Sequence, residues 1–104
     1  MQKVEIPNKE KLIQILRANH ITYAALFGSR AKGIARPDSD YDLMVEFDRH
    51  YPIPLSRFVK VEDVIEKAVS SKVDLITTRG TNKRLHDEID KTKVVLYDER
   101  RKNR

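Results

Sequence analysis

The sequence predicts one small α/β (α+β) domain in which helices flank a mixed β-sheet. The first observation is length, because 104 residues fit a single domain of ordinary small size. The second is composition: 39% of the residues are hydrophobic and 36% are charged, which supports a modest core under a heavily charged surface. The third is pattern, because helical and strand-like segments alternate along the chain. Short connections between them favour a small mixed sheet over a doubly wound one.

The first predicted helix covers residues 8–20, where Leu12 and Leu16 belong to an apolar stripe at helical spacing. Asn8 is the expected N-cap, since an asparagine side chain at that position commonly accepts a backbone hydrogen bond. The apolar run "ITYAALF", residues 21–27, then predicts a buried strand.

A glycine-bounded turn leads into the second predicted strand. The segment "SRAKG", residues 29–33, indicates a short helical turn closed by its glycine, and a loop rich in turn formers follows. Residues 41–47, "YDLMVEF", alternate in polarity, so every second side chain shares a face of the strand. The apolar face comprises Tyr41, Leu43, Val45 and Phe47.

The second half of the chain continues the alternation. We expect a helix over 55–70, a strand over 72–78, a polar helix over 81–93 and a last short strand over 94–97. The residues expected on or near one apolar stripe of the 55–70 helix are Leu55, Phe58, Ile65, Ala68 and Val69.

The charge balance is basic. The chain has 21 Lys and Arg against 16 Asp and Glu, a net charge of +5, which suits an acidic ligand such as a nucleotide or an acidic protein face. Part of the excess lies in "ERRKNR", residues 99–104, which we expect to be a solvated basic tail behind a domain of residues 1–98. The basic residues of the last helix lack interleaved aromatic residues, which argues against nucleic-acid binding.

The absence of cysteine excludes disulfides, thiolate nucleophiles and cysteine-based zinc sites. It agrees with a reducing compartment. The first residues lack the apolar run of a signal peptide, and no apolar stretch has the length of a membrane span. We therefore expect a cytoplasmic protein without membrane attachment.

Three aspartates are the candidate catalytic and metal-binding residues. Asp40 and Asp42 are separated by one residue at the start of a strand, so their side chains project to the same side. Asp74 is a lone acid in the apolar stretch "VDLIT", where a charge needs a partner or a site. Carboxylate oxygens are the ligands that Mg²⁺ takes together with substrate phosphates. The alternative is that "PDSDYD" is a turn followed by a solvated strand start.

Residues suited to phosphate binding precede the aspartates. Gly28 lies at a strand-to-turn junction, where the absence of a side chain allows close approach of a ligand to the backbone. The Ser29 hydroxyl and the N–H groups that follow it can hold phosphate oxygens. Arg30, Lys32 and Arg36 add cations to the connecting loop.

The string "GSRAKGIARPDSDYDL" resembles the signature of the polymerase-β-like nucleotidyltransferase superfamily, in its minimal nucleotidyltransferase (MNT) branch. The resemblance covers about residues 10–97 and implies the nucleotidyltransferase fold. It implies that Asp40, Asp42 and Asp74 bind two Mg²⁺ ions and that Asp74 also assists deprotonation of an attacking hydroxyl. Gly28 and Ser29 would bind the triphosphate of ATP, and Arg30 would make phosphate or structural contacts.

The resemblance also implies a partner. MNT proteins are often antitoxins paired with a helical HEPN toxin, and some transfer AMP from ATP to a tyrosine of that toxin. The chain has no second domain for acceptor recognition, so a partner, a dimer mate or an exposed surface must choose the acceptor. Two alternatives remain: a non-catalytic antitoxin that neutralises its partner by binding, and a transferase acting on a small molecule or an RNA end.

Overall fold

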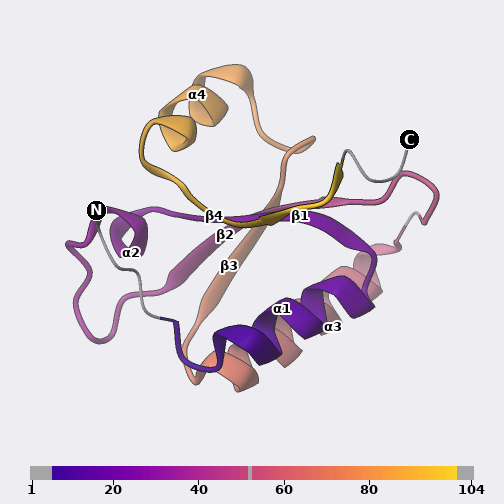
Figure 1. The fold of residues 1–104 in the computed structure, drawn as a ribbon, viewed down its shortest axis with the longest axis horizontal. Coiled ribbons are helices and arrows are strands. Elements are labelled where there is room, and N and C mark those ends of the chain that lie inside the picture. Colours follow the sequence, from indigo (N-terminus) through magenta and orange to yellow (C-terminus); the bar gives the residue numbers. More distant parts are fainter. Residues whose placement is uncertain (1–5, 52, 101–104) are drawn as a thin grey trace.

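The computed structural model describes residues 6–51 and 53–100 and shows helices and strands in strict alternation (Figure 1). The predicted elements are all present, with ends within two residues of those expected from the sequence. In chain order they are α1 (Lys9–Ala18), β1 (Ile21–Phe27), α2 (Ser29–Lys32), β2 (Tyr41–Phe47), α3 (Leu55–Val69), β3 (Val73–Thr77), α4 (Lys83–Thr92) and β4 (Val94–Asp98).

The four strands form one mixed sheet in the order β3-β2-β1-β4. β1 is antiparallel to both β2 and β4, whereas β2 and β3 are parallel. The parallel pair is joined by α3, the helix that a crossover between parallel strands requires. The predicted mixed sheet flanked by helices is confirmed.

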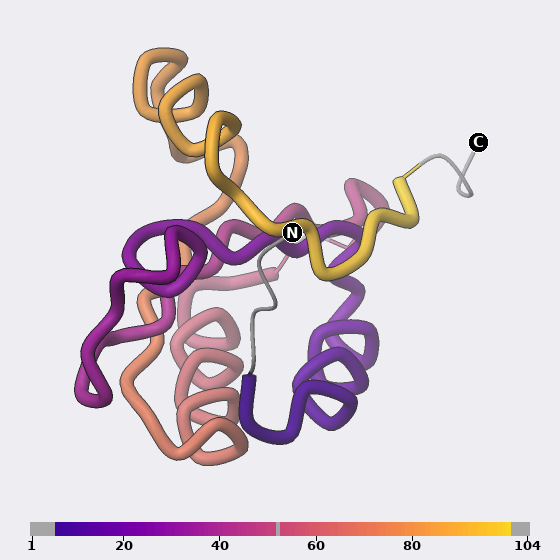
Figure 2. The backbone as a smooth tube through the Cα atoms, turned by 60° about the vertical axis from the view of Figure 1, so that its left-hand side comes forward, coloured from indigo at the N-terminus to yellow at the C-terminus, as the bar shows by residue number. Residues whose placement is uncertain are grey.

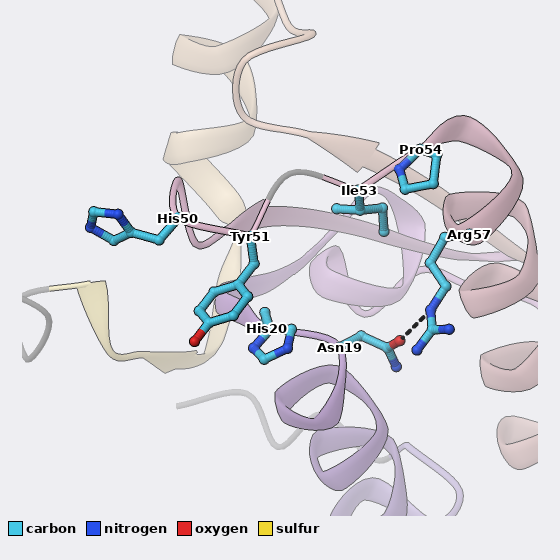
Figure 3. Close-up of a pocket in the computed structure, with 7 residues that line it drawn as sticks. All are labelled: Asn19, His20, His50, Tyr51, Ile53, Pro54 and Arg57. Carbon is cyan, nitrogen blue, oxygen red and sulfur yellow. Dashed lines mark hydrogen bonds between the residues drawn. The ribbon is translucent and has the colours of Figure 1, made fainter.

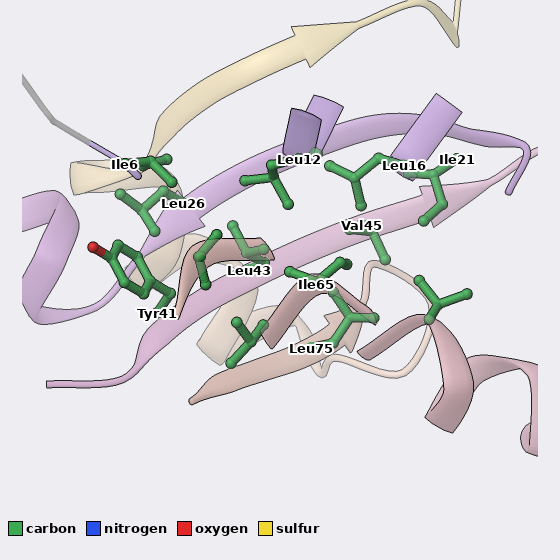
Figure 4. Packing of buried hydrophobic residues seen from close by; sticks show 14 of the residues in the cluster. Ile6, Leu12, Leu16, Ile21, Leu26, Tyr41, Leu43, Val45, Ile65 and Leu75 are labelled. Carbon is green, nitrogen blue, oxygen red and sulfur yellow. The ribbon is translucent and has the colours of Figure 1, made fainter. Parts of the chain in front are cut away.

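The hydrophobic core lies between the sheet and two helices. α1 and α3 lie side by side on one face of the sheet, while α4 lies on the opposite side (Figures 1 and 2). Leu12 and Leu16 of α1 and Ile65 of α3 are each at most 1% exposed and pack against strand residues such as Leu43 and Val45 (Figure 4). The alternation of β2 is confirmed on this face.

Two local predictions about the helices need correction. Asn8 is the N-cap of α1, as predicted, but its side chain does not make the expected capping hydrogen bond. Its backbone is left-handed, with φ 54°, and its Nδ2 instead donates to the carbonyl oxygen of Ala68 at 2.8 Å, which ties the start of α1 to the end of α3. Leu55 is 77% exposed rather than part of the buried stripe. At about 100° per residue it lies roughly a quarter turn from the stripe's centre, which Val61 and Ile65 share.

The end of the described chain is attached to the domain. Glu99 accepts a hydrogen bond from Arg17 at 3.2 Å. Arg100 pairs with Asp98 at 2.8 Å and with Glu46 at 3.3 Å. The rest of the expected basic tail, residues 101–104, lies outside the described residues, as do residues 1–5 and residue 52. Within the described part of the chain, no helix has both the length and the apolar character that a bilayer span needs.

Candidate functional site

Asp42 and Asp74 are direct neighbours in the sheet. They pair in register across the parallel strands β2 and β3. The residues that follow them, Leu43 and Leu75, are buried in the core against α1 and α3. Because side chains alternate along a strand, both aspartates project from the opposite face of the sheet. The structure therefore places two of the three predicted site aspartates directly beside each other.

Asp40 and Asp74 both repel the Asp42 carboxylate. Asp42 is half-buried, whereas Asp40 and Asp74 are exposed. Burial raises the pKa of Asp42 above its ordinary value, and the charges of Asp74 and Asp40 raise it further. All three predicted acids are thus close enough to interact electrostatically at this end of β2.

Gly28 lies against the Asp42 carboxylate at the end of β1. The register places Phe27 opposite Asp42, so Gly28 follows directly at the same end of the strand pair. Its φ of 77° is in the left-handed region, and a Cβ atom at this position would overlap the Asp42 side chain. The positive φ favours glycine at this position, and a larger residue would also have to displace the Asp42 carboxylate. The sequence predicted close approach of a ligand here, and the structure shows close approach of Asp42.

Ser29 begins the short helix α2 immediately after this glycine. It is partly buried, and within the described residues its hydroxyl makes no hydrogen bond. The hydroxyl therefore remains available to a ligand beside the aspartates.

Arg30 is bound to the loop that leads into β2. Its Nη2 donates to the carbonyl oxygens of Ser39 at 2.8 Å and Pro37 at 3.1 Å, and its Nε donates to Ser39 at 3.3 Å. Its guanidinium also lies over the Tyr41 ring, 4.3 Å from the centroid. Of the two roles considered for Arg30, these contacts favour a structural one, since they fix the residues on both sides of Asp40.

The donor set has the chemistry of a magnesium site. Three carboxylates lie at one end of two adjacent strands, and oxygen ligands of this kind suit Mg²⁺. Among residues 6–51 and 53–100, no three His, Asp or Glu side chains already surround a point where a metal ion fits. A cation would offset the repulsion among the three carboxylates.

A separate pocket of about 440 Å³ lies at the other end of the β1–β2 pair (Figure 3). Ile21 pairs with Phe47 at that end, whereas Phe27 pairs with Asp42 at the end near the aspartates. His20 stacks on Tyr51 at 3.8 Å between ring centroids. This pocket contains none of the predicted site residues. The three aspartates and the Gly28–Ser29 turn therefore remain the better candidate for a nucleotide site. The remaining lining residues are Asn19, His50, Ile53, Pro54 and Arg57.

Comparison with known protein families and sequences identifies the family of the chain. Residues 10–102 match the family described as polymerase beta, nucleotidyltransferase. A Methanocaldococcus jannaschii chain named "Putative protein adenylyltransferase MJ1379" is 39% identical over 77 residues, which cover 73% of this chain and 75% of the relative. Protein adenylyltransferase MntA of Thermococcus cleftensis is 38% identical over 52 residues, which cover 49% of this chain and 50% of that one.

Solved structures share the fold. A crystal structure of a toxin-antitoxin with AMP-PNP has a TM-score of 0.77 at 24% identity, covering 91% of this chain and 77% of that chain. A tri-AMPylated Shewanella oneidensis HEPN toxin in complex with MNT antitoxin has a TM-score of 0.69 at 21% identity, covering 92% and 74%. At these identities the likeness establishes the fold.

Proposed function

Because this chain belongs to the polymerase beta nucleotidyltransferase family, we propose that it is a Mg²⁺-dependent protein adenylyltransferase that moves AMP from ATP to a tyrosine hydroxyl of a HEPN-type toxin. The observation that carries the proposal is the in-register pair of Asp42 and Asp74, beside Asp40 and facing the Gly28–Ser29 turn. By this reaction the protein acts as an antitoxin.

Each site residue has a proposed role. Asp40 and Asp42 hold the metal ions, and Asp74 contributes a ligand and accepts the proton of the attacking hydroxyl. When bound, two Mg²⁺ ions supply charge stabilisation to the attacking and leaving oxygens. The Ser29 hydroxyl and the backbone at Gly28 bind the triphosphate. Arg30 holds the loop that carries Asp40.

The reaction is an in-line displacement at the α-phosphorus. The tyrosine oxygen forms a bond to phosphorus, the bond to the bridging oxygen breaks, and pyrophosphate leaves with that oxygen. The hydroxyl proton passes to Asp74. Few protein groups are needed, because positioning and fixed charges supply most of the rate.

A partner supplies the acceptor. The structural neighbours include complexes between an MNT antitoxin and a HEPN toxin, one of which is AMPylated. Those complexes support a HEPN-type partner for this chain. A tyrosine on a separate protein also agrees with the size of the chain, in which the described residues form a single sheet with its helices.

The test is transfer of label from α-³²P-labelled ATP to a HEPN-type toxin protein, in the presence of Mg²⁺. We expect label on a partner tyrosine with the wild type and none with Asp40→Asn combined with Asp42→Asn. Asp38→Asn is the matched control, because Asp38 is an exposed acid of the same loop outside the predicted site. Absence of label from the partner with wild-type protein contradicts the proposal.

The same double variant separates chemistry from binding. If it still neutralises the toxin in cells as well as the wild type does, the protein acts by covering its partner. We expect neutralisation to be lost, because the proposed antitoxin activity depends on AMP transfer.

A further inference from the structure

Among the residues that the structure describes, β3 is an edge strand that pairs with β2 on one side only. On its other side, two backbone N–H groups donate to carboxylates of α3. The N–H of Val73 donates to Oε2 of Glu66 at 3.0 Å, and the N–H of Leu75 donates to Oε2 of Glu62 at 3.2 Å. These two hydrogen bonds bracket Asp74, the residue between them.

The spacing of the two glutamates matches the strand. Glu62 and Glu66 are one helical turn apart, and four residues of an α-helix rise about 6 Å. Val73 and Leu75 are two residues apart, which is about 6.6 Å along a strand. The chain reverses direction between α3 and β3, so the later glutamate meets the earlier strand residue. Both side chains are partly buried, which limits competition from water.

Asp74 is a residue whose backbone needs support of this kind. It lies in register beside Asp42, and the two like charges repel each other across the strands. β3 has only five residues and a ladder on one side. Hydrogen bonds from a backbone N–H to a carboxylate are roughly twice as strong as those between neutral groups. Two of them on the outer side of β3 therefore oppose any displacement of the strand.

We propose that Glu62 and Glu66 are positioning residues that hold Asp74 at the place the shared metal site requires. This inference rests on the function proposed above. Neither glutamate touches the reacting atoms, and both act through the β3 backbone. The competing explanation is edge protection alone, since a covered edge also blocks pairing with another chain.

The test compares three kinds of variant in the full chain. Glu62→Ala and Glu66→Ala, singly and together, remove the acceptor oxygens. Glu62→Gln and Glu66→Gln keep an acceptor of the same shape without the charge. Asp63→Ala is the matched control, because Asp63 is an exposed acid of the same helix that pairs with Lys67.

The measurements are kcat and KM for ATP with the helical partner as acceptor, Mn²⁺ affinity, and amide exchange at Val73 and Leu75. For the double alanine variant we expect kcat and Mn²⁺ affinity to fall about 10-fold to 100-fold, the range for residues that orient metal ligands. KM for ATP should stay within threefold, since the glutamates do not contact nucleotide. Exchange at the two amides should accelerate, and the glutamine variants should recover most of kcat.

Several results would overturn the inference. Unchanged kcat and Mn²⁺ affinity in the double alanine variant would show that the two glutamates only protect the edge of β3. An equal loss of kcat and Mn²⁺ affinity in Asp63→Ala would show that removing any negative charge from α3 has the same effect. Circular dichroism checks whether each variant is folded, because an unfolded variant would lose kcat for a trivial reason. If the double alanine variant is unfolded, the glutamine variants decide instead. A full loss of kcat in folded glutamine variants contradicts positioning through hydrogen bonds alone.

Failure of the proposed function leaves a separate outcome. If the wild type transfers no label but binds Mn²⁺, the affinity series alone decides whether Glu62 and Glu66 position Asp74. If the wild type binds no Mn²⁺, the inference and the metal-dependent function are both wrong.

Discussion

Asp42 carries its charge in a half-buried position beside two other carboxylates. Burial is the largest cause of its raised pKa, and the charges of Asp74 and Asp40 follow. An isolated acid so placed is a cost to the fold. Gly28 shows that the surrounding chain is built to accept this acid, because any side chain at that position would overlap the carboxylate.

Asp42→Asn should therefore stabilise the protein at neutral pH while abolishing activity. Because the pKa of Asp42 is higher in the folded than in the unfolded state, protonation of Asp42 stabilises the folded protein. This stabilisation is complete below the ordinary carboxyl pKa and is lost as the pH rises through the raised pKa. We expect a higher Tm for the variant by thermal unfolding at neutral pH, because the neutral amide avoids both the burial cost and the repulsion of the charged carboxylate. The advantage should shrink as the pH falls towards about 4.

Asp38→Asn is the control for Asp42→Asn and should leave Tm nearly unchanged. A lower Tm of Asp42→Asn at pH 7, measured without added divalent cation, would contradict the electrostatic description of the site.

Arg30→Lys tests whether the guanidinium binds the loop or the nucleotide. A lysine keeps the charge but cannot reproduce the fork of hydrogen bonds to Ser39 and Pro37. We expect kcat to fall by about tenfold, the lower end of the range for residues that orient metal ligands. ATP affinity, measured by calorimetric titration, should change less than threefold. A large loss of ATP affinity with kcat retained would assign Arg30 to phosphate binding instead.

At the scale of elements, periodicity accounts for what the sequence could predict. Helices and strands followed from apolar spacing, and alternation of β2 correctly separated its core face from the face of Asp42. Leu55 was misplaced because it lies about a quarter turn from the centre of the buried stripe of α3. Asn8 was correctly predicted at the N-cap, but its hydrogen bond was not, because its side chain bonds to Ala68, a residue far away in sequence.

The sequence likewise indicated some residues of the candidate site and not others. Asp40 and Asp42 could be found because both lie in one short motif, and Asp74 because a charge inside an apolar strand is unusual. The supporting contacts could not be found, because Glu62 and Glu66 look like ordinary glutamates of an exposed helix face until β3 is placed beside α3. The strand order, and hence the position of β3 beside α3, is set by long-range packing.

The attachment of β4 to the sheet provides a prediction at this scale. The Tyr97 hydroxyl donates to the carbonyl oxygen of Ile21, and burial raises the pKa of Tyr97 well above its ordinary value. Tyr97→Phe leaves that buried carbonyl without this donor, so we expect the free energy of unfolding in urea to fall by about 1 kcal/mol. Tyr51→Phe, at an exposed ring stacked on His20, should have little effect. Equal stability of the two variants would show that the Tyr97 hydrogen bond contributes nothing.

At the scale of the whole molecule, the described residues form one sheet with its helices and place the chemistry at one end of it. The aspartates, the Gly28–Ser29 turn and the loop held by Arg30 all gather where β1 ends and β2 begins. The pocket lined by His20 and Tyr51 lies at the far end of the same strand pair. Separation of the two ends leaves room for a partner protein to present a hydroxyl at the acidic end without contact with that pocket.

The overall charge of +5 is compatible with an acidic partner or nucleotide, but the local charge at the site is negative. ATP is itself an anion, so it can bind beside three carboxylates only if cations accompany it. Divalent cation binding is therefore the physical requirement on which the proposed reaction depends.

The most direct test counts the Mn²⁺ ions that the full chain binds together with a non-hydrolysable ATP analogue, followed by electron paramagnetic resonance. We predict about two ions for the wild type, as in other two-metal sites, and about one for Asp74→Asn. Asp40→Asn combined with Asp42→Asn should bind none beyond the ion carried by free nucleotide. The same count for Asp74→Asn and the wild type would show that Asp74 does not share the metal site, and would contradict the arrangement of catalytic acids proposed here.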